Sequence, residues 1–208
     1  MEEGNSNKTI VMGPQFCSPQ PLQLFIKKKV YFMGGHGYEV KDDYGNLVFT
    51  IENVLGFFRS KLIVFDAANV PILTLKSKKF SWHSRWQSFK GDSTDEKDLI
   101  FSAKTSSKFQ FTRKLDIFLA NNISEQVCDF RMKASYRESN CHIFAGQSST
   151  LIAQMDKKYT TGSIFLGRDK FMVRVNPNVD HAFIVSLLVI LEEMASSGNS
   201  SSTHSSSP

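Results

Sequence analysis

The stretch of sequence that decides the fold is Val179–Leu191, which reads V-D-H-A-F-I-V-S-L-L-V-I-L. Ten of its thirteen residues are apolar. On a helix that turns about 100° per residue, these positions leave no polar face. A surface helix carries an apolar stripe, whereas a helix that is apolar on all sides is buried in protein or in lipid. The remaining sequence should therefore contain the material that encloses this segment.

The flanking residues predict a helix over 178–194. Asn176-Pro177-Asn178 offers N-cap residues and a proline suited to a first turn, while Glu192 and Glu193 mark the return to water. Val179–Met194 would be about 24 Å long as a helix. A bilayer core is about 30 Å thick and requires about 20 apolar residues. We therefore favour a buried core helix, with a C-terminal membrane anchor as the alternative.

Composition indicates an intracellular, β-rich chain of one large or two small domains. The 208 residues are 41% hydrophobic, and most of the 18 phenylalanines lie in alternating runs, which favours strands. The net charge of +5 permits contact with an anionic surface without requiring it. The polar N-terminus lacks the apolar core of a signal peptide, and three cysteines without metal-type spacing indicate reduced thiols.

Short strand-like pieces follow one another from residue 22 to residue 175. Turn residues separate them, for example at Asp42–Asn46 and Asp66–Pro71, and this spacing is typical of antiparallel hairpins. The alternation predicts one buried and one wet face for many of these strands. Leu22–Met33 is predicted to hold one or two strands. The other predicted strands are Tyr38–Lys41, Leu47–Ile51, Phe58–Phe65, Ile72–Lys78, Phe80–Lys90, Leu99–Lys104, Lys108–Thr112, Leu115–Ala120, Val127–Lys133, His142–Ala145, Leu151–Lys158, Thr161–Leu166 and Phe171–Val175.

A meander of this size must close on itself or leave exposed edges. Closing it around the apolar helix gives the helix a sleeve and fills a wide barrel. The sequence thus predicts a mainly β fold, a closed antiparallel β-barrel of about 12 strands around a central hydrophobic C-terminal α-helix. We expect a flexible lead-in at 1–21 that docks at Phe16 and Cys17, one barrel domain at 22–195, and a disordered Ser-rich tail at 196–208.

Several short motifs follow one another along the chain. They are S-W-H-S-R-W-Q-S-F at 81–89, G-D-S-T-D at 91–95, D-L at 98–99, C-D-F-R at 128–131, F-L-G at 165–167 and V-N-P-N-V-D-H-A-F-I at 175–184. In these motifs the sequence resembles the plant LURP-one-related proteins, and the resemblance runs in order from about Cys17 to Met194. The resemblance implies a Tubby-like fold, a twelve-stranded barrel that encloses a hydrophobic C-terminal helix. It also implies kinship with Tubby C-terminal domains and phospholipid scramblases, a lineage of membrane-tethered, phosphoinositide-responsive transcription factors. Some relatives are linked to pathogen defence, and the resemblance does not establish an enzymatic activity.

The sequence contains no recognisable catalytic or metal-binding set. A Gly-rich phosphate loop, a G-x-S-x-G elbow and a Cys–His signature are missing, and the five histidines are dispersed. The Asp42–Asn46 turn lacks the alternating acidic ligands and the distal glutamate of a calcium loop. We therefore predict a protein that is not an enzyme and has no cofactor and no metal site.

Two groups of side chains are candidates for binding. Trp82 and Trp86 share one strand face and lie beside basic residues, so they could stack on bases or sit at a membrane interface, although we favour packing within the barrel. The candidate lipid-headgroup patch consists of Lys76, Lys78, Lys79 and Arg85. Lys76 and Lys78 point the same way on one predicted strand, Arg85 lies on the next, and Lys79 lies between the two strands. The competing interpretation is solvated strand faces and edge lysines that discourage aggregation.

The resulting functional hypothesis is a signalling module that binds phosphoinositides or other anionic phospholipids and acts through an unidentified protein partner. We expect a monomer without a transmembrane segment, in the cytoplasm or nucleus, and peripheral at the plasma membrane when bound to lipid. One alternative is a nucleic-acid-binding transcriptional regulator, although a recognition helix and a dense basic stripe are missing. The other is a lipid-translocating, scramblase-like membrane protein.

Overall fold

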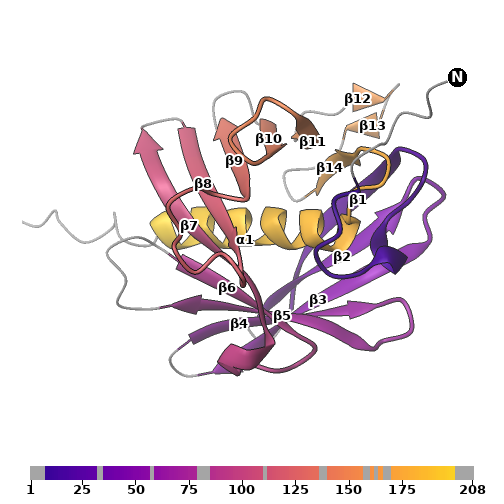
Figure 1. The fold of residues 1–208 in the computed structure, drawn as a ribbon. Coiled ribbons are helices and arrows are strands. Elements are labelled where there is room, and N and C mark those ends of the chain that lie inside the picture. Colours follow the sequence, from indigo (N-terminus) through magenta and orange to yellow (C-terminus); the bar gives the residue numbers. More distant parts are fainter. Residues whose placement is uncertain are drawn as a thin grey trace, which may run out of the picture.

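The computed structural model describes residues 8–31, 35–56, 59–78, 85–109, 112–135, 140–156, 160–161, 164–165 and 170–199. They form a closed barrel of twelve antiparallel strands around one helix (Figure 1). The barrel strands are β1 (Leu22–Val30), β2 (His36–Asp42), β3 (Leu47–Gly56), β4 (Arg59–Asp66), β5 (Pro71–Lys78), β6 (Arg85–Lys90), β7 (Leu99–Phe109), β8 (Thr112–Leu119), β9 (Phe130–Ser135), β10 (Asn140–Ala145), β11 (Leu151–Asp156) and β14 (Lys170–Val175). The remaining elements are the 3₁₀ turns η1 (Pro14–Phe16) and η2 (Glu96–Asp98), the two-stranded sheet of β12 (Thr160–Thr161) and β13 (Ile164–Phe165), and the helix α1 (His181–Asn199).

Strand β1 closes the barrel because it pairs on both of its sides. Leu24 lies opposite Asp42 of β2 on one side and opposite Val173 of β14 on the other. From β1 to β11 each strand pairs with the next along the chain, and β14 then joins β11 to β1. The predicted fold class is thus confirmed, including the number of strands and the place of the helix.

The alternation in the strands sorts side chains into an interior and an exterior. Leu73 and Leu75 of β5 are completely buried, as are Leu115 and Ile117 of β8. Successive side chains of a strand point to opposite faces. Side chains on the opposite face of the same strands, such as those of Lys76 and Asp116, therefore point to the outside of the barrel.

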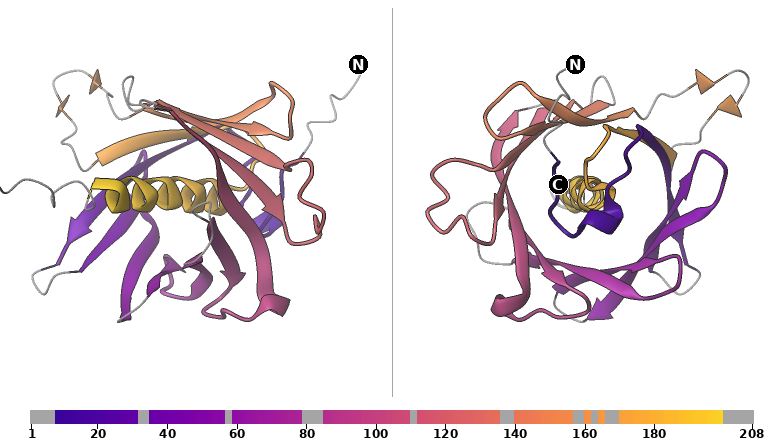
Figure 2. Two further views of the ribbon diagram at one scale, coloured as in Figure 1. Left: turned by 90° about the vertical axis from the view of Figure 1, so that its left-hand side faces the viewer. Right: turned by 45° about the vertical axis from the view of Figure 1, so that its right-hand side comes forward.

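Helix α1 runs through the interior of the barrel (Figure 2). All ten residues from 182 to 191 are buried. Phe183 packs against the rings of Phe101 and Phe130, with centroids 5.2 and 4.8 Å away. The buried hydroxyl of Ser186 has a hydrogen-bond partner within the helix, because it donates to the carbonyl oxygen of Phe183 at 2.7 Å. The helix is apolar on all sides because the barrel surrounds it on all sides.

Asp180 joins the start of the helix to the N-terminal segment. Its Oδ1 accepts a hydrogen bond from the Phe183 N–H at 3.0 Å, which is N-capping geometry. Its Oδ2 accepts from the backbone N–H groups of residues 11, 12 and 13 at 3.2, 2.6 and 3.3 Å. The ring centres of Phe16 and His181 are 5.9 Å apart. Cys17 and Asp180 form an isolated antiparallel β-bridge through their backbones. Residues 8–17 of the expected flexible lead-in therefore have defined contacts with the helix.

A second polar cluster lies at the other end of the helix. Glu193 is 5% exposed and accepts hydrogen bonds from the Tyr38 hydroxyl at 2.8 Å and the His36 Nε2 at 2.6 Å. Burial, followed by the nearby Glu193 charge, strongly raises the pKa of the Tyr38 hydroxyl. This cluster lets a carboxylate enter the barrel mouth without remaining unpaired.

Some predicted boundaries differ from the structure. The separate strand predicted at Lys108–Thr112 is wrong, because Lys108 and Phe109 end β7 and Thr112 begins β8. Val127–Asp129 belong to the connection before β9, and the helix continues to Asn199 instead of ending at residue 194. The strand predicted at Thr161–Leu166 is replaced by the short pair β12 and β13. The predicted tail beyond residue 199 lies outside the described residues.

Candidate functional site

Three cationic side chains stand in direct cross-strand register on the outside of the barrel. Lys78 of β5 pairs with Arg85 of β6, and Arg85 pairs with Lys104 of β7. Neighbouring strands are about 4.8 Å apart, so the Cα atoms of Lys78 and Lys104, at the two ends of this set, are about 10 Å apart. We call Lys78, Arg85 and Lys104 the cationic row. Like charges placed directly opposite one another destabilise a sheet, so the row needs anionic compensation.

Two further lysines lie in the neighbouring register position. Lys76 of β5 is opposite Lys61 of β4, and its Nζ lies 6.0 Å from the centre of the Phe89 ring. The Lys61 Nζ donates to the Asp92 carbonyl at 3.3 Å. Among the described residues, neither Lys76 nor Lys78 makes an ion pair. The outer face of β4 to β7 thus carries more positive charge than its own carboxylates neutralise.

Glu125 supplies the negative charge for part of the cationic row. Its carboxylate forms a short ion pair with the Arg85 guanidinium and accepts from the Lys104 Nζ at 3.3 Å and the Ser102 hydroxyl at 3.2 Å. Partial burial raises the pKa of the Glu125 carboxyl, but the hydrogen bonds and charges of Arg85 and Lys104 outweigh it and hold the pKa below its usual range. Glu125 is therefore ionised at neutral pH.

The connection between β8 and β9, residues 120–129, brings Glu125 to this position. In the end-on view the connection lies outside the barrel wall (Figure 2). The Asn122 amide donates to the Val127 carbonyl and to Asp129, at 2.8 Å in each case, while the Asn122 Oδ1 accepts from the Glu125 N–H at 3.2 Å. Phe118 of β8 points outward yet is only 3% exposed, and the Lys104 Nζ lies 4.4 Å from the centre of its ring.

The structure brings three of the four predicted headgroup residues to one face. Lys76, Lys78 and Arg85 occupy adjacent positions of β5 and β6, whereas Lys79 lies outside the described residues. Sequence reasoning missed Lys104 and Glu125. The alternation of β7 places Lys104 on an outer face, but strand register determines that it lies beside Arg85.

Of the predicted aromatic pair, Trp82 and Trp86, the structure describes only Trp86. Trp86 points inward and is 4% exposed, in agreement with the favoured interpretation of core packing. Trp82 and His83 lie outside the described residues.

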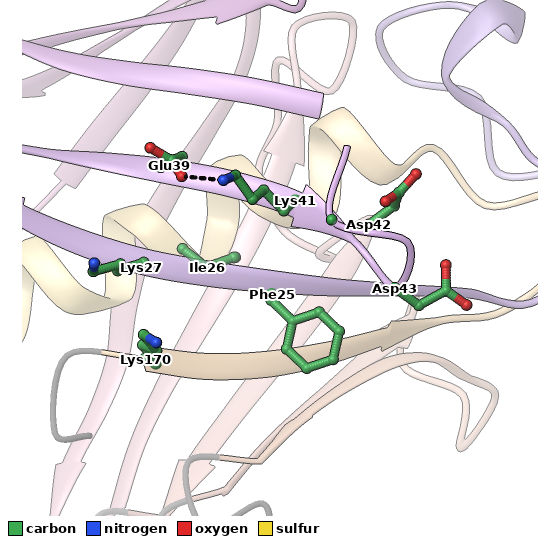
Figure 3. A pocket seen from close by; sticks show the side chains of 9 residues that line it. Phe25, Ile26, Lys27, Glu39, Lys41, Asp42, Asp43 and Lys170 are labelled. Carbon is green, nitrogen blue, oxygen red and sulfur yellow. Dashed lines mark ion pairs between the residues drawn. The ribbon is translucent and has the colours of Figure 1, made fainter. Parts of the chain in front are cut away.

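A groove of about 380 Å³ lies on the opposite side of the barrel, over β1, β2 and β14 (Figure 3). Lys27 and Lys170 pair across the strands at one end, and Asp42 and Asp43 lie at the other end with the Phe25 ring between them. The lining residues are Phe25, Ile26, Lys27, Glu39, Lys41, Asp42, Asp43, Gly45 and Lys170. Three of these are lysines and three are carboxylates, so the groove is balanced in charge.

Glu39 of this groove is already paired. Its carboxylate forms ion pairs with Lys29 and, at 2.9 Å, with the Nζ of Lys41. The hydrogen bonds from Lys29 and then Lys41 hold the pKa of the Glu39 carboxyl below its usual range. Because the groove neutralises itself, the cationic row is the better candidate for binding an anion.

The described residues also bear on two other features, metal centres and membrane-spanning helices. These residues include no group of three or more His, Cys, Asp or Glu side chains that could hold a metal ion. Within the same ranges, no helix is both long enough and apolar enough to cross a membrane.

The fold and site define a class of protein: a barrel filled by its own helix, with its candidate binding groups on the outer surface. Residues 22–192 match the sequence model of the family described as LURP-one-related, and the chain belongs to that family. It is similar to two Arabidopsis thaliana proteins. LURP-one-related 15 is 42% identical over 89% of this chain and 85% of that protein, and LURP-one-related 10 is 44% identical over 88% and 95%.

A solved structure supports the same assignment. The X-ray structure of an Arabidopsis thaliana protein matches with a TM-score of 0.71 and 35% sequence identity. The match covers 89% of this chain and 98% of that one. The predicted family resemblance is therefore confirmed.

Proposed function

We propose that this protein is a non-enzymatic signalling module that binds anionic phospholipid headgroups, phosphoinositides among them, through the cationic row. The observation that carries the proposal is the direct register of Lys78, Arg85 and Lys104 on three adjacent strands. A rigid sheet fixes the backbone positions of these residues, which lowers the ordering cost of binding.

The chemistry of the row suits a phosphate group. Arginine offers a planar fork that can donate two parallel hydrogen bonds to phosphate, and lysine adds a mobile point charge. Lys76 and Lys78 are unpaired among the described residues, so they can contact a headgroup without breaking an ion pair. Several phosphates on one headgroup would engage more of these cations than a single phosphate can.

The wider proposal follows the resemblance to Tubby and phospholipid scramblase proteins. We propose a monomer of the cytoplasm or nucleus that docks peripherally at the plasma membrane and passes a signal to a protein partner. In some relatives such signalling is linked to pathogen defence. The net charge of +5 supports contact with an anionic membrane surface.

Vesicle flotation tests the proposal. Wild-type protein should float with phosphatidylcholine vesicles that contain about 5% phosphatidylinositol bisphosphate and should not float with pure phosphatidylcholine; each basic residue near a membrane contributes about 1 kcal/mol, or about fivefold in affinity. The double variant Lys76→Glu, Lys78→Glu should lose most of this binding. It leaves the ion pairs of Glu125 intact, so lost binding does not reflect an unpaired buried charge.

The matched control is Lys27→Glu, Lys170→Glu, which makes the same charge change at the groove on the opposite side of the barrel. This control should retain wild-type flotation. Absence of wild-type binding at low salt would refute the proposal, and selective loss in the groove variant would refute the cationic row as its site. Tight, salt-sensitive retention of duplex DNA without lipid binding would instead favour the nucleic-acid alternative.

A further inference from the structure

The 120–129 connection presents opposite chemistry on its two sides. Towards the barrel, Glu125 neutralises Arg85 and Lys104. Towards solvent, Ile123 is 92% exposed and Val127 is 57% exposed. A carboxylate is thus placed over the cations, and two branched apolar side chains are left in water on the same short segment.

The backbone of this connection is held in an unfavourable conformation. Glu125 has φ of 47°, in the left-handed region that residues other than glycine, asparagine and aspartate rarely adopt. The Asn122 side chain maintains this geometry through its bonds to the Glu125 N–H and the Val127 carbonyl. Strain of this kind persists where surrounding contacts enforce it, and it clusters at ligand clamps and switch segments.

The exposed pair is also unusual for its position. Single apolar side chains on a surface need no explanation, but Ile123 and Val127 flank the carboxylate that caps the candidate headgroup site. Apolar side chains next to clustered cations are typical of segments that enter the boundary between headgroups and acyl chains. The combination matches an anionic bilayer, which offers both apolar depth and phosphate.

We propose that residues 120–129 form a membrane-docking loop in which Glu125 occupies the headgroup site until a lipid phosphate replaces it. On an anionic bilayer, Ile123 and Val127 enter the interface while a phosphate takes over the hydrogen bonds of Arg85 and Lys104. The inference rests on the proposed lipid binding and adds the depth of insertion and the competition at the site. Glu125 thereby lowers the affinity for lipid, since only molecules with a vacated site can bind phosphate.

The first test measures insertion directly. The variant Ile123→Trp should show a blue-shifted tryptophan emission with anionic vesicles and quenching by brominated acyl chains. The control is Tyr44→Trp, at an 87% exposed position of the β2–β3 hairpin, where neither change should occur. Equal responses at both positions, or no response at residue 123, would overturn the inference.

The second test separates the two faces of the loop. Glu125→Gln keeps the shape and removes the competing charge, so binding should become about three- to tenfold tighter for both vesicles and soluble inositol trisphosphate. The variant Ile123→Ser, Val127→Ser should weaken vesicle binding at least about tenfold and leave inositol trisphosphate binding unchanged. Unchanged affinities in both variants would refute the docking loop.

These outcomes are distinguishable from failure of the proposed function. If wild-type protein binds anionic vesicles but all loop variants behave like it, lipid binding stands and the docking loop is refuted. If wild-type protein binds neither vesicles nor inositol trisphosphate, both proposals are refuted. Thermal unfolding of each variant confirms that the compared proteins are folded.

Discussion

At the scale of single residues, Asp180 performs two structural tasks with its two carboxylate oxygens. One oxygen caps the helix at Phe183, and the other accepts three backbone N–H groups from the N-terminal segment. A carboxylate can do both because ionised oxygens accept several hydrogen bonds, each stronger than a neutral one. The side chain is completely buried, so any donor left behind by its removal would remain unsatisfied.

Asp180→Ala should therefore lower the free energy of unfolding by about 2–4 kcal/mol, from the lost cap and the lost charge-assisted bonds. Limited proteolysis should also release residues 8–17 before the barrel is cleaved. Asp180→Asn retains a single acceptor oxygen and should fall between wild type and alanine. If the Asp180→Ala variant were cleaved at the same rate and in the same order as the wild-type protein, this role of Asp180 would be contradicted.

The next residue, His181, makes stability depend on pH. Burial lowers the pKa of its imidazole, although the Asp180 charge and the Phe16 backbone oppose the shift. The unfolded chain thus binds a proton that the folded chain does not, and the free energy of unfolding should fall as pH drops below about 6.5. Denaturant unfolding at several pH values should show a smaller fall for His181→Gln. An unchanged pH dependence in that variant would argue against a buried neutral histidine.

Only some residues of the candidate site could be predicted from the sequence. Lys76, Lys78 and Arg85 could be placed on one face because a single hairpin determines their relation. Lys104 and Glu125 could not, since Lys104 depends on the β6–β7 register and Glu125 reaches the site through a connection with left-handed backbone geometry. Neither feature leaves a motif in the sequence.

At the scale of elements, helix α1 determines whether the barrel can exist. Leu187 is completely buried near the middle of the helix. Each strand of the barrel contributes apolar side chains to the same core, including Phe101 and Phe130 around Phe183. The helix and the strands therefore bury one another, and neither has an alternative apolar partner among the described residues.

Leu187→Ala should cost about 2–5 kcal/mol of unfolding free energy, because it leaves a cavity between the helix and the barrel. Leu187→Glu should prevent folding, which circular dichroism and solubility would show. Ser196→Ala, at the exposed end of the helix, is the control and should change stability by less than about 0.5 kcal/mol. A folded, soluble Leu187→Glu protein would show that the helix is not part of the core.

Element boundaries were predictable only where turn chemistry marks them. The Asp42–Asn46 turn was placed correctly because Asp42 accepts from the Tyr44 and Asn46 N–H groups and Gly45 has φ of 87°. The wrong strand at Lys108–Thr112 has no such marker, since a long β7 and a short separate strand present the same alternation. Register between neighbours, unlike alternation within a strand, depends on the whole closed sheet.

At the scale of the whole molecule, filling the barrel with its own helix moves binding to the outside. The outer face of β4 to β7 and the groove over β1, β2 and β14 both carry clustered lysines. Only the former retains an excess of positive charge after the described carboxylates are counted, with Glu125 shared between Arg85 and Lys104. Of these two faces, the outer face of β4 to β7 is therefore the better match for an anionic membrane.

The most direct test is the affinity for anionic vesicles of a variant that lacks two of the three row cations. Arg85→Gln, Lys104→Gln and Glu125→Gln together remove these two cations and the carboxylate that pairs with both of them, so none of the three leaves its partner unpaired. The control Lys170→Gln has the same net charge change of −1. The account predicts at least about tenfold weaker binding for the triple variant, since about 1 kcal/mol is lost per cation, and wild-type binding for the control. Wild-type affinity in a folded triple variant would contradict the account.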